Sequence, residues 1–136
     1  MTTGKMLMGG CLCGGVRYRV MAEMSDISLC HCSQCARTTG HIFASADCSA
    51  DALTFDESRA LRWYRSSEKA ERGFCSECGG NLFWRKIDGD VISVTAGTLD
   101  RPTGLRLKHH IYCASRSDYD EIRDQLPQYA AEAKAG

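Results

Sequence analysis

The chain has 136 residues, which is room for one domain with a single hydrophobic core. Seventeen basic residues balance seventeen acidic ones, so no overall field draws the chain to nucleic acid or an anionic membrane. No segment has the roughly 20 apolar residues that span a bilayer, and the start lacks the apolar run of a secretory signal. We therefore expect a cytoplasmic protein without nucleic-acid or membrane partners. Residues 1–136 should form one domain with its core at about 7–126 and a tail that frays.

Four short segments predict antiparallel β-strands, because they are rich in β-branched and aromatic residues and are bounded by Gly, Asp, Ser and Asn. They cover residues 15–21, 60–66, 80–86 and 90–97. One helix is expected over 117–133, where Ser117 suits the N-cap, acidic residues fill the first turn, and apolar residues recur at helical spacing. The predicted fold class is mainly β, with small antiparallel sheets and a short C-terminal helix.

Cysteine is the most informative residue type in the chain. The chain has nine cysteines, so at least one of them is unpaired, and the protein is expected in a reducing compartment. Metal ligation fits this usage better than a framework of disulfides.

Two cysteine pairs match the half-sites of a structural zinc site. Cys11 and Cys13 lie two residues apart, a spacing that on a strand points both sulfurs to one side. Cys75 and Cys78 form a Cys-x-x-Cys followed by glycine, a turn that frees backbone N–H groups to bond the thiolates. Together the pairs predict a four-thiolate site that joins segments more than sixty residues apart and stabilises the fold.

The remaining cluster contains Cys30, Cys32 and Cys35 and is one thiolate short of a closed structural site. Three thiolates with a fourth position open to water or substrate are the arrangement that catalytic zinc uses. The alternative is a second closed structural site, completed by Cys48, Cys113 or a histidine. Cys48 and Cys113 otherwise fit small buried apolar residues.

Five polar residues, four histidines and one arginine, are candidates for roles beside this cluster. His31 and His41 are candidate proton carriers, although either could also point to solvent. His109 and His110 should lie on opposite faces of a strand, so at most one of them reaches a site. Arg37 either balances the negative charge of the thiolates or binds a substrate carboxylate.

The sequence resembles the glutathione-dependent formaldehyde-activating enzyme family, which also includes centromere protein V. The motifs that carry the resemblance occur in the family's order from about residue 9 to 122, and they are "GGCLCGGVRY", "CHCSQCARTTG", "LRWYRSSEKAERGFCSECGGNLFW", "VISVTAGTLDRP" and "HIYCASRSDYDEI". The resemblance implies a zinc-stabilised, tent-like fold with two zinc ions per chain. One is structural, on Cys11, Cys13, Cys75 and Cys78, and the other is catalytic, on Cys30, Cys32 and Cys35.

The resemblance also implies an activity, that of a carbon–sulfur lyase. Glutathione would complete the three-cysteine site and add through its sulfur to formaldehyde or a small aldehyde, giving an S-hydroxymethyl adduct. The expected catalytic set is Cys30, Cys32, Cys35, His31 and Arg37. The alternatives are a non-catalytic zinc scaffold that binds a protein partner and a thiol redox switch.

Overall fold

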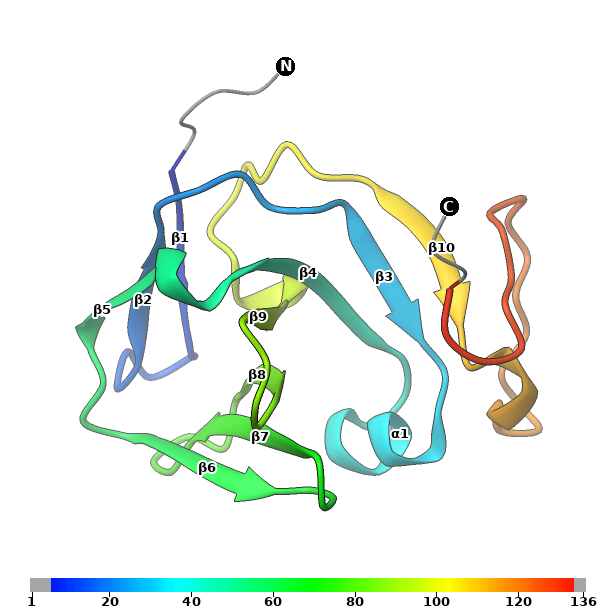
Figure 1. The fold of residues 1–136 in the computed structure, drawn as a ribbon, viewed down its shortest axis with the longest axis horizontal. Coiled ribbons are helices and arrows are strands. Elements are labelled where there is room, and N and C mark those ends of the chain that lie inside the picture. Colours follow the sequence, from blue (N-terminus) through cyan, green and yellow to red (C-terminus); the bar gives the residue numbers. More distant parts are fainter. Residues whose placement is uncertain (1–5, 134–136) are drawn as a thin grey trace.

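The computed structural model describes residues 6–133, and within them ten strands form two sheets (Figure 1). The smaller sheet has the order β1-β2-β5 and consists of β1 (Leu7–Gly10), β2 (Arg17–Val20) and β5 (Leu53–Glu57). The larger sheet has the order β10-β3-β4-β9-β8-β7-β6. Its strands are β3 (Ile27–Cys30), β4 (Phe43–Ser49), β6 (Leu61–Arg65), β7 (Ala70–Cys75), β8 (Asn81–Lys86), β9 (Val91–Thr95) and β10 (Leu107–Ile111). The prediction of a mainly β fold is confirmed.

One short helix, α1 (Ser33–Thr39), connects β3 to β4. Cys32 caps its first turn, because the Cys32 sulfur accepts a hydrogen bond from the backbone N–H of Cys35. Gly40 ends it with a left-handed φ of 98°, which only glycine adopts without strain. The remaining helical turns are three short 3₁₀ segments, Ala50–Ala52, Ala96–Thr98 and Cys113–Ser115. No helix within 6–133 combines the length and apolar character needed to cross a membrane.

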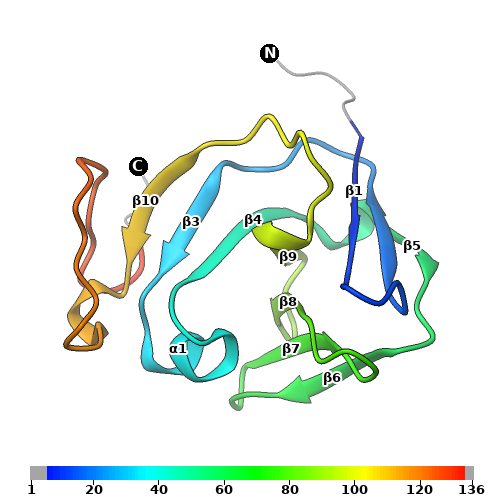
Figure 2. The same cartoon turned by 180° about the vertical axis from the view of Figure 1, so that it is seen from behind.

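Strand pairing is antiparallel, as predicted, with one exception. β10 runs parallel to β3, with His110 opposite Leu29 and Ile111 opposite Cys30. A tight hairpin forces neighbouring strands to be antiparallel, whereas β3 and β10 are separated by most of the fold and are free to run the same way. Figure 2 shows β10 and β3 side by side at one end of the larger sheet. Cys30, the last residue of β3, is therefore held between Ile111 of β10 and Phe43 of β4.

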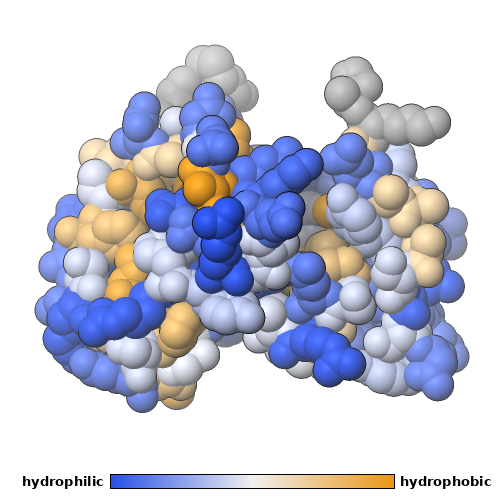
Figure 3. Space-filling model, turned by 60° about the horizontal axis from the view of Figure 1, so that its bottom comes forward, coloured by the Kyte–Doolittle hydropathy of each residue, from blue (hydrophilic) through white to orange (hydrophobic). Residues whose placement is uncertain are grey.

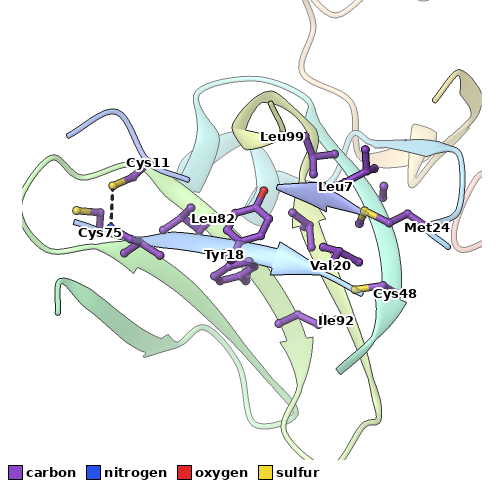
Figure 4. Close-up of a cluster of buried hydrophobic side chains, with 14 of the residues drawn as sticks. Leu7, Cys11, Tyr18, Val20, Met24, Cys48, Cys75, Leu82, Ile92 and Leu99 are labelled. Atoms are coloured by element: carbon purple, nitrogen blue, oxygen red, sulfur yellow. Dashed lines mark hydrogen bonds between the residues drawn. The ribbon is translucent and has the colours of Figure 1, made fainter. Parts of the chain in front are cut away.

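The main core lies between the two sheets. On β2, Tyr18 and Val20 point inward and are completely buried, while Arg19 between them is exposed. The Tyr18 ring meets the Phe83 ring edge-on at 5.3 Å, and the Tyr18 hydroxyl is hydrogen-bonded to the Thr98 hydroxyl at 2.7 Å. Figure 4 shows this cluster, with Cys11 and Cys75 pointing toward one another at one end. The smaller sheet is therefore joined to the larger one by apolar packing and, at that end, by cysteines.

The predicted helix over 117–133 is wrong, because this segment forms an irregular strap beside β10. The backbone of His110 donates to the Pro127 carbonyl and accepts from the N–H of Tyr129. Asp120, read from the sequence as a residue that stabilises a helix start, is buried and accepts a hydrogen bond from His31 instead. These tertiary contacts outweigh a local helical preference of a few tenths of a kcal/mol per residue. The carbonyls of Ala130 and Ala131 also accept hydrogen bonds, from Ala114 and Tyr112, while residues 134–136 of the expected frayed tail lie outside the described residues.

Replacing Asp120 by alanine should lower the stability of the protein by about 1–3 kcal/mol, because the buried His31 loses one of its two hydrogen-bond partners. We expect a lower melting temperature by circular dichroism and faster proteolysis of the strap. The matched control is Asp118→Ala, an exposed aspartate two residues away. Equal melting temperatures for the two variants would contradict this account of the strap.

Candidate functional site

The four-cysteine cluster, Cys11, Cys13, Cys75 and Cys78, lies where the β1–β2 turn meets the β7–β8 turn. All four sulfurs lie within 4.8 Å of one another. Both turns aim backbone N–H groups at the sulfurs. Those of Val16 and Gly15 bond Cys11 and Cys13 at 3.3 and 3.4 Å, and those of Cys78 and Glu77 bond Cys75 at 3.3 and 3.4 Å. Such bonds stabilise thiolates, so the turns are built for ionised sulfur.

The spacing of these sulfurs fits a tetrahedral metal ion. Cys13 lies 3.7 Å from Cys11 and 3.6 Å from Cys75, measured between sulfurs. Sulfurs at the corners of a tetrahedron around zinc, each about 2.3 Å from the metal, are about 3.8 Å apart. A disulfide would bring two of them to about 2.05 Å, and every cysteine is a free thiol. The four-cysteine cluster could therefore hold one metal ion.

The three-cysteine cluster, Cys30, Cys32 and Cys35, is formed by the end of β3 and the start of α1. Cys30 is the last residue of β3, Cys32 is the N-cap, and Cys35 lies one helical turn later on the buried side of α1. Their sulfurs also lie within 4.8 Å of one another. Phe43, Trp84 and Ile111 pack around them. A strand that runs directly into a helix thus gathers three sulfurs from six consecutive residues.

The three sulfurs are too close to ionise together without a cation. Hydrogen bonds with Cys30 and Cys35 lower the pKa of Cys32, so this residue loses its proton first. The same contact with Cys32, the contact with Cys35 and burial raise the pKa of Cys30. One thiolate therefore suppresses ionisation of its neighbour. A bound cation would reverse this, because each thiolate would then be stabilised by positive charge. The donor set fits a soft divalent ion such as zinc.

No further metal-ligating side chain joins the three-cysteine cluster within residues 6–133. Cys48 is buried in the main core, and Cys113 is buried in the 3₁₀ turn after β10, so neither of these suggested fourth ligands lies in the cluster. Residues 1–5 and 134–136 contain no Cys, His, Asp or Glu. The fourth position is thus not filled by any ligand from the described part of the chain.

His31 belongs to a row of polar side chains that is buried at His31, His110 and Asp120 and ends at the exposed Asp124. Its Nδ1 is 2.6 Å from an Asp120 oxygen, and its Nε2 is 2.8 Å from Nδ1 of His110. His110 in turn reaches Asp124 at 3.0 Å. Both ring nitrogens of His31 therefore have partners that are not cysteines. The row connects β3, β10 and the strap directly behind the three-cysteine cluster.

The other candidate side chains lie apart from the buried sulfurs. Arg37 is exposed in the last turn of α1, and its side chain makes no hydrogen bond with another residue of 6–133. His41 is exposed and stands 5.6 Å, ring to ring, from Tyr119. His109 and His110 have different environments, as expected, and Nε2 of His109 is 3.0 Å from the Ser28 hydroxyl.

Arg72 is the residue at the three-cysteine cluster that sequence reasoning missed. It lies on β7 opposite Trp84 of β8 and is only 4% exposed. Its Nη2 donates to the sulfur of Cys35 at 3.7 Å, and its guanidinium lies 5.7 Å from the centre of the Phe43 ring. The alternation of side chains along a strand could have indicated its burial, because Arg72 lies on the same face of β7 as the buried Ala70.

Two hollows on the described part of the chain lie away from the three-cysteine cluster. A hollow of about 240 Å³ is lined by Leu7, Met24 and Leu105 among others. A shallow one of about 570 Å³ lies beside the strap, lined by Asp120 and Cys113 among others. Neither includes the three-cysteine cluster, in which Cys32 is the least buried member. A ligand would therefore approach from the Cys32 side.

Comparison with known proteins found a matching family, two similar proteins and one similar crystal structure. A profile of the family described as glutathione-dependent formaldehyde-activating enzyme matches residues 6–115. A Schizosaccharomyces pombe protein named as an uncharacterized lyase is 31% identical over 81 residues, 60% of this chain but only 58% of that protein. A Halomonas elongata protein provisionally named as a glutathione-dependent formaldehyde-activating enzyme is 28% identical over 135 residues, covering 88% of this chain and 83% of that protein. The crystal structure of a Rhodobacter sphaeroides protein shares the fold, with a TM-score of 0.59 at 22% identity over 74% of this chain and 99% of that one.

Proposed function

Because the chain belongs to the glutathione-dependent formaldehyde-activating enzyme family, we propose that it is a zinc-dependent carbon–sulfur lyase. In the synthetic direction it would add the thiol of glutathione to formaldehyde or a small aldehyde. The observation that carries the proposal is the three-cysteine cluster, whose fourth position is not filled by any residue of 6–133. An open position on a thiolate site is where a substrate thiol can bind.

In this proposal the two clusters have different tasks. The four-cysteine cluster would hold a structural zinc ion, and the three-cysteine cluster a catalytic one, giving two per chain. A zinc ion at the second position would keep an incoming thiol in its thiolate form near neutral pH. The substrate sulfur would then form a bond to the carbonyl carbon, the π electrons of the carbonyl would move to its oxygen, and that oxygen would take up a proton.

The surrounding side chains suggest separate roles in this reaction. Arg37, exposed and without a partner in the described chain, is available to bind a glutathione carboxylate from solvent. His41, also exposed, is available as a proton carrier. His31 would act by holding the end of β3 against the strap, because both of its ring nitrogens are already hydrogen-bonded.

The proposal is tested by measuring exchange between glutathione, formaldehyde and their adduct at equilibrium, with isotope-labelled formaldehyde and exchange NMR. Equilibrium exchange is preferable to product accumulation, because the uncatalysed addition is fast and a tenfold acceleration needs only about 1.4 kcal/mol. We expect an exchange rate that rises linearly with protein concentration. An exchange rate equal to the thiol background at every protein concentration would contradict the proposal.

A non-catalytic scaffold that binds a protein partner is less well supported. Figure 3 shows one face of the molecule, on which hydrophobic side chains occur in interrupted groups among hydrophilic ones. Such a face lacks the continuous apolar patch that often marks a docking site. We also propose a reducing compartment such as the cytoplasm, because nine cysteines, seven of them in two clusters that could hold metal ions, fit metal ligation better than disulfides.

A further inference from the structure

Arg72 is a buried charge that the proposed reaction does not yet use. Only 4% of the residue is exposed to solvent, yet its side chain forms no ion pair with an aspartate or glutamate within residues 6–133. Its one hydrogen bond is to the sulfur of Cys35. A buried arginine is ordinarily matched by a carboxylate, so the sulfur cluster takes the place of the usual counter-charge.

Two nitrogens of Arg72, Nε and Nη1, are buried and have no hydrogen-bond partner among the described residues. In a planar guanidinium, each of them forms one edge of the fork together with Nη2. Nη2 is the nitrogen that already reaches Cys35. An anion placed next to the Cys35 sulfur would therefore meet a second N–H group on whichever edge it approached.

The charge of the site leads to the same conclusion. A divalent ion with three thiolates carries one net negative charge, and a fourth thiolate would add another. The guanidinium of Arg72 offsets one of these charges at a distance of 3.7 Å from Cys35. Among the described residues, no carboxylate pairs with Arg72 and cancels this effect.

We propose that Arg72 is an anion-binding residue of the three-cysteine cluster, whose free N–H groups donate to the thiolate sulfur of the thiol that binds there. The inference rests on the proposed function. It adds that the Arg72 guanidinium makes the site bind a thiolate more tightly than a neutral ligand. On binding, the thiol would lose its proton to the buffer, and its sulfur would enter from the Cys32 side and accept hydrogen bonds from the guanidinium. Arg37 would contact only distant carboxylates of the ligand.

The test uses protein loaded with Co²⁺, whose bonds to sulfur give charge-transfer absorption that reports each added thiolate. The probe is 2-mercaptoethanol, which has no carboxylate, so that contacts with Arg37 do not enter the measurement. The variants are Arg72→Lys, which keeps the charge but loses the planar fork, and Arg72→Gln, which loses the charge. Arg62→Lys, at an exposed arginine on β6, is the matched control.

We expect the wild type and Arg62→Lys to bind the thiol equally, and Arg72→Lys and Arg72→Gln to bind it about 10–100-fold more weakly. The cobalt signal of the four-cysteine cluster reports whether each variant is folded. If Arg72→Gln fails to fold, the affinity of Arg72→Lys decides the question. Wild-type affinity in the folded Arg72 variants would overturn this inference and leave the proposed function intact. A wild type that gains no thiolate absorption would overturn both.

Discussion

Cys75→Ser should leave a protein that neither binds its structural metal nor folds stably. The Cys75 sulfur is completely buried, accepts two backbone N–H bonds and lies 3.6 Å from the sulfur of Cys13. A structural zinc ion contributes about 10–16 kcal/mol of apparent binding free energy in small domains. The net stability of a whole domain is about 5–15 kcal/mol. Loss of such an ion would therefore remove a free energy as large as the whole free energy of unfolding of the domain.

Cys48→Ser is the matched control for this experiment. Cys48 is equally a buried cysteine, 6% exposed in the main core, but it belongs to neither cluster. We expect it to keep its metal and to lose about 1–3 kcal/mol, the cost of a buried hydroxyl without a partner. Circular dichroism and elemental analysis measure both effects. A Cys75→Ser protein with the melting temperature and zinc content of Cys48→Ser would refute the structural role of the cluster.

Cys32→Ser should abolish adduct exchange while the protein stays folded. Serine is among the best N-cap residues, so the hydroxyl can replace the cysteine sulfur in accepting the N–H of Cys35 at the start of α1. The substitution therefore removes a proposed metal ligand but keeps the helix cap. Loss of residues that merely support a metal ligand costs about 10–100-fold in affinity or activity. We expect the loss of a ligand itself to exceed 100-fold, which brings exchange down to the uncatalysed rate.

The control for this second experiment is Ser33→Ala, at the exposed next residue of the same helical turn. We expect wild-type exchange and a melting temperature within a few degrees of the wild type. Cys32→Ser should match that melting temperature and contain one zinc ion fewer per chain. Wild-type exchange by a folded Cys32→Ser protein would show that the reaction does not occur at this cluster.

Both cysteine clusters could be predicted from the sequence because their geometry is local. A Cys-x-x-Cys turn or a strand that runs into a helix cap places its sulfurs within a few residues, so spacing alone indicates the half-site. The structure adds that the β1–β2 and β7–β8 turns meet, which joins the two pairs. The identity of the metal is inferred from the sulfur ligands.

Alternation along β7 could indicate that Arg72 is buried, but the cysteine beside it and the course of the strap are determined by long-range packing and could not be predicted. Arginine on a strand is usually exposed, and only the approach of α1 to β7 shows that Arg72 is enclosed beside Cys35. The acidic residues of the strap resembled the first turn of a helix, but Asp120 pairs with His31, 89 residues away. The parallel pairing of β10 with β3 has the same origin, since no local turn specifies it.

The central claim is that one cysteine cluster holds a structural zinc ion and the other a catalytic one. Its most direct test is the number of zinc ions per chain. The protein would be purified without added metal or chelator, and zinc measured by elemental analysis against an accurate protein concentration. The account predicts about two zinc ions per chain, one in each cluster, falling to one in Cys32→Ser. One ion per chain in the wild type, unchanged in Cys32→Ser, would mean that the three-cysteine cluster holds no metal and would contradict the proposed lyase.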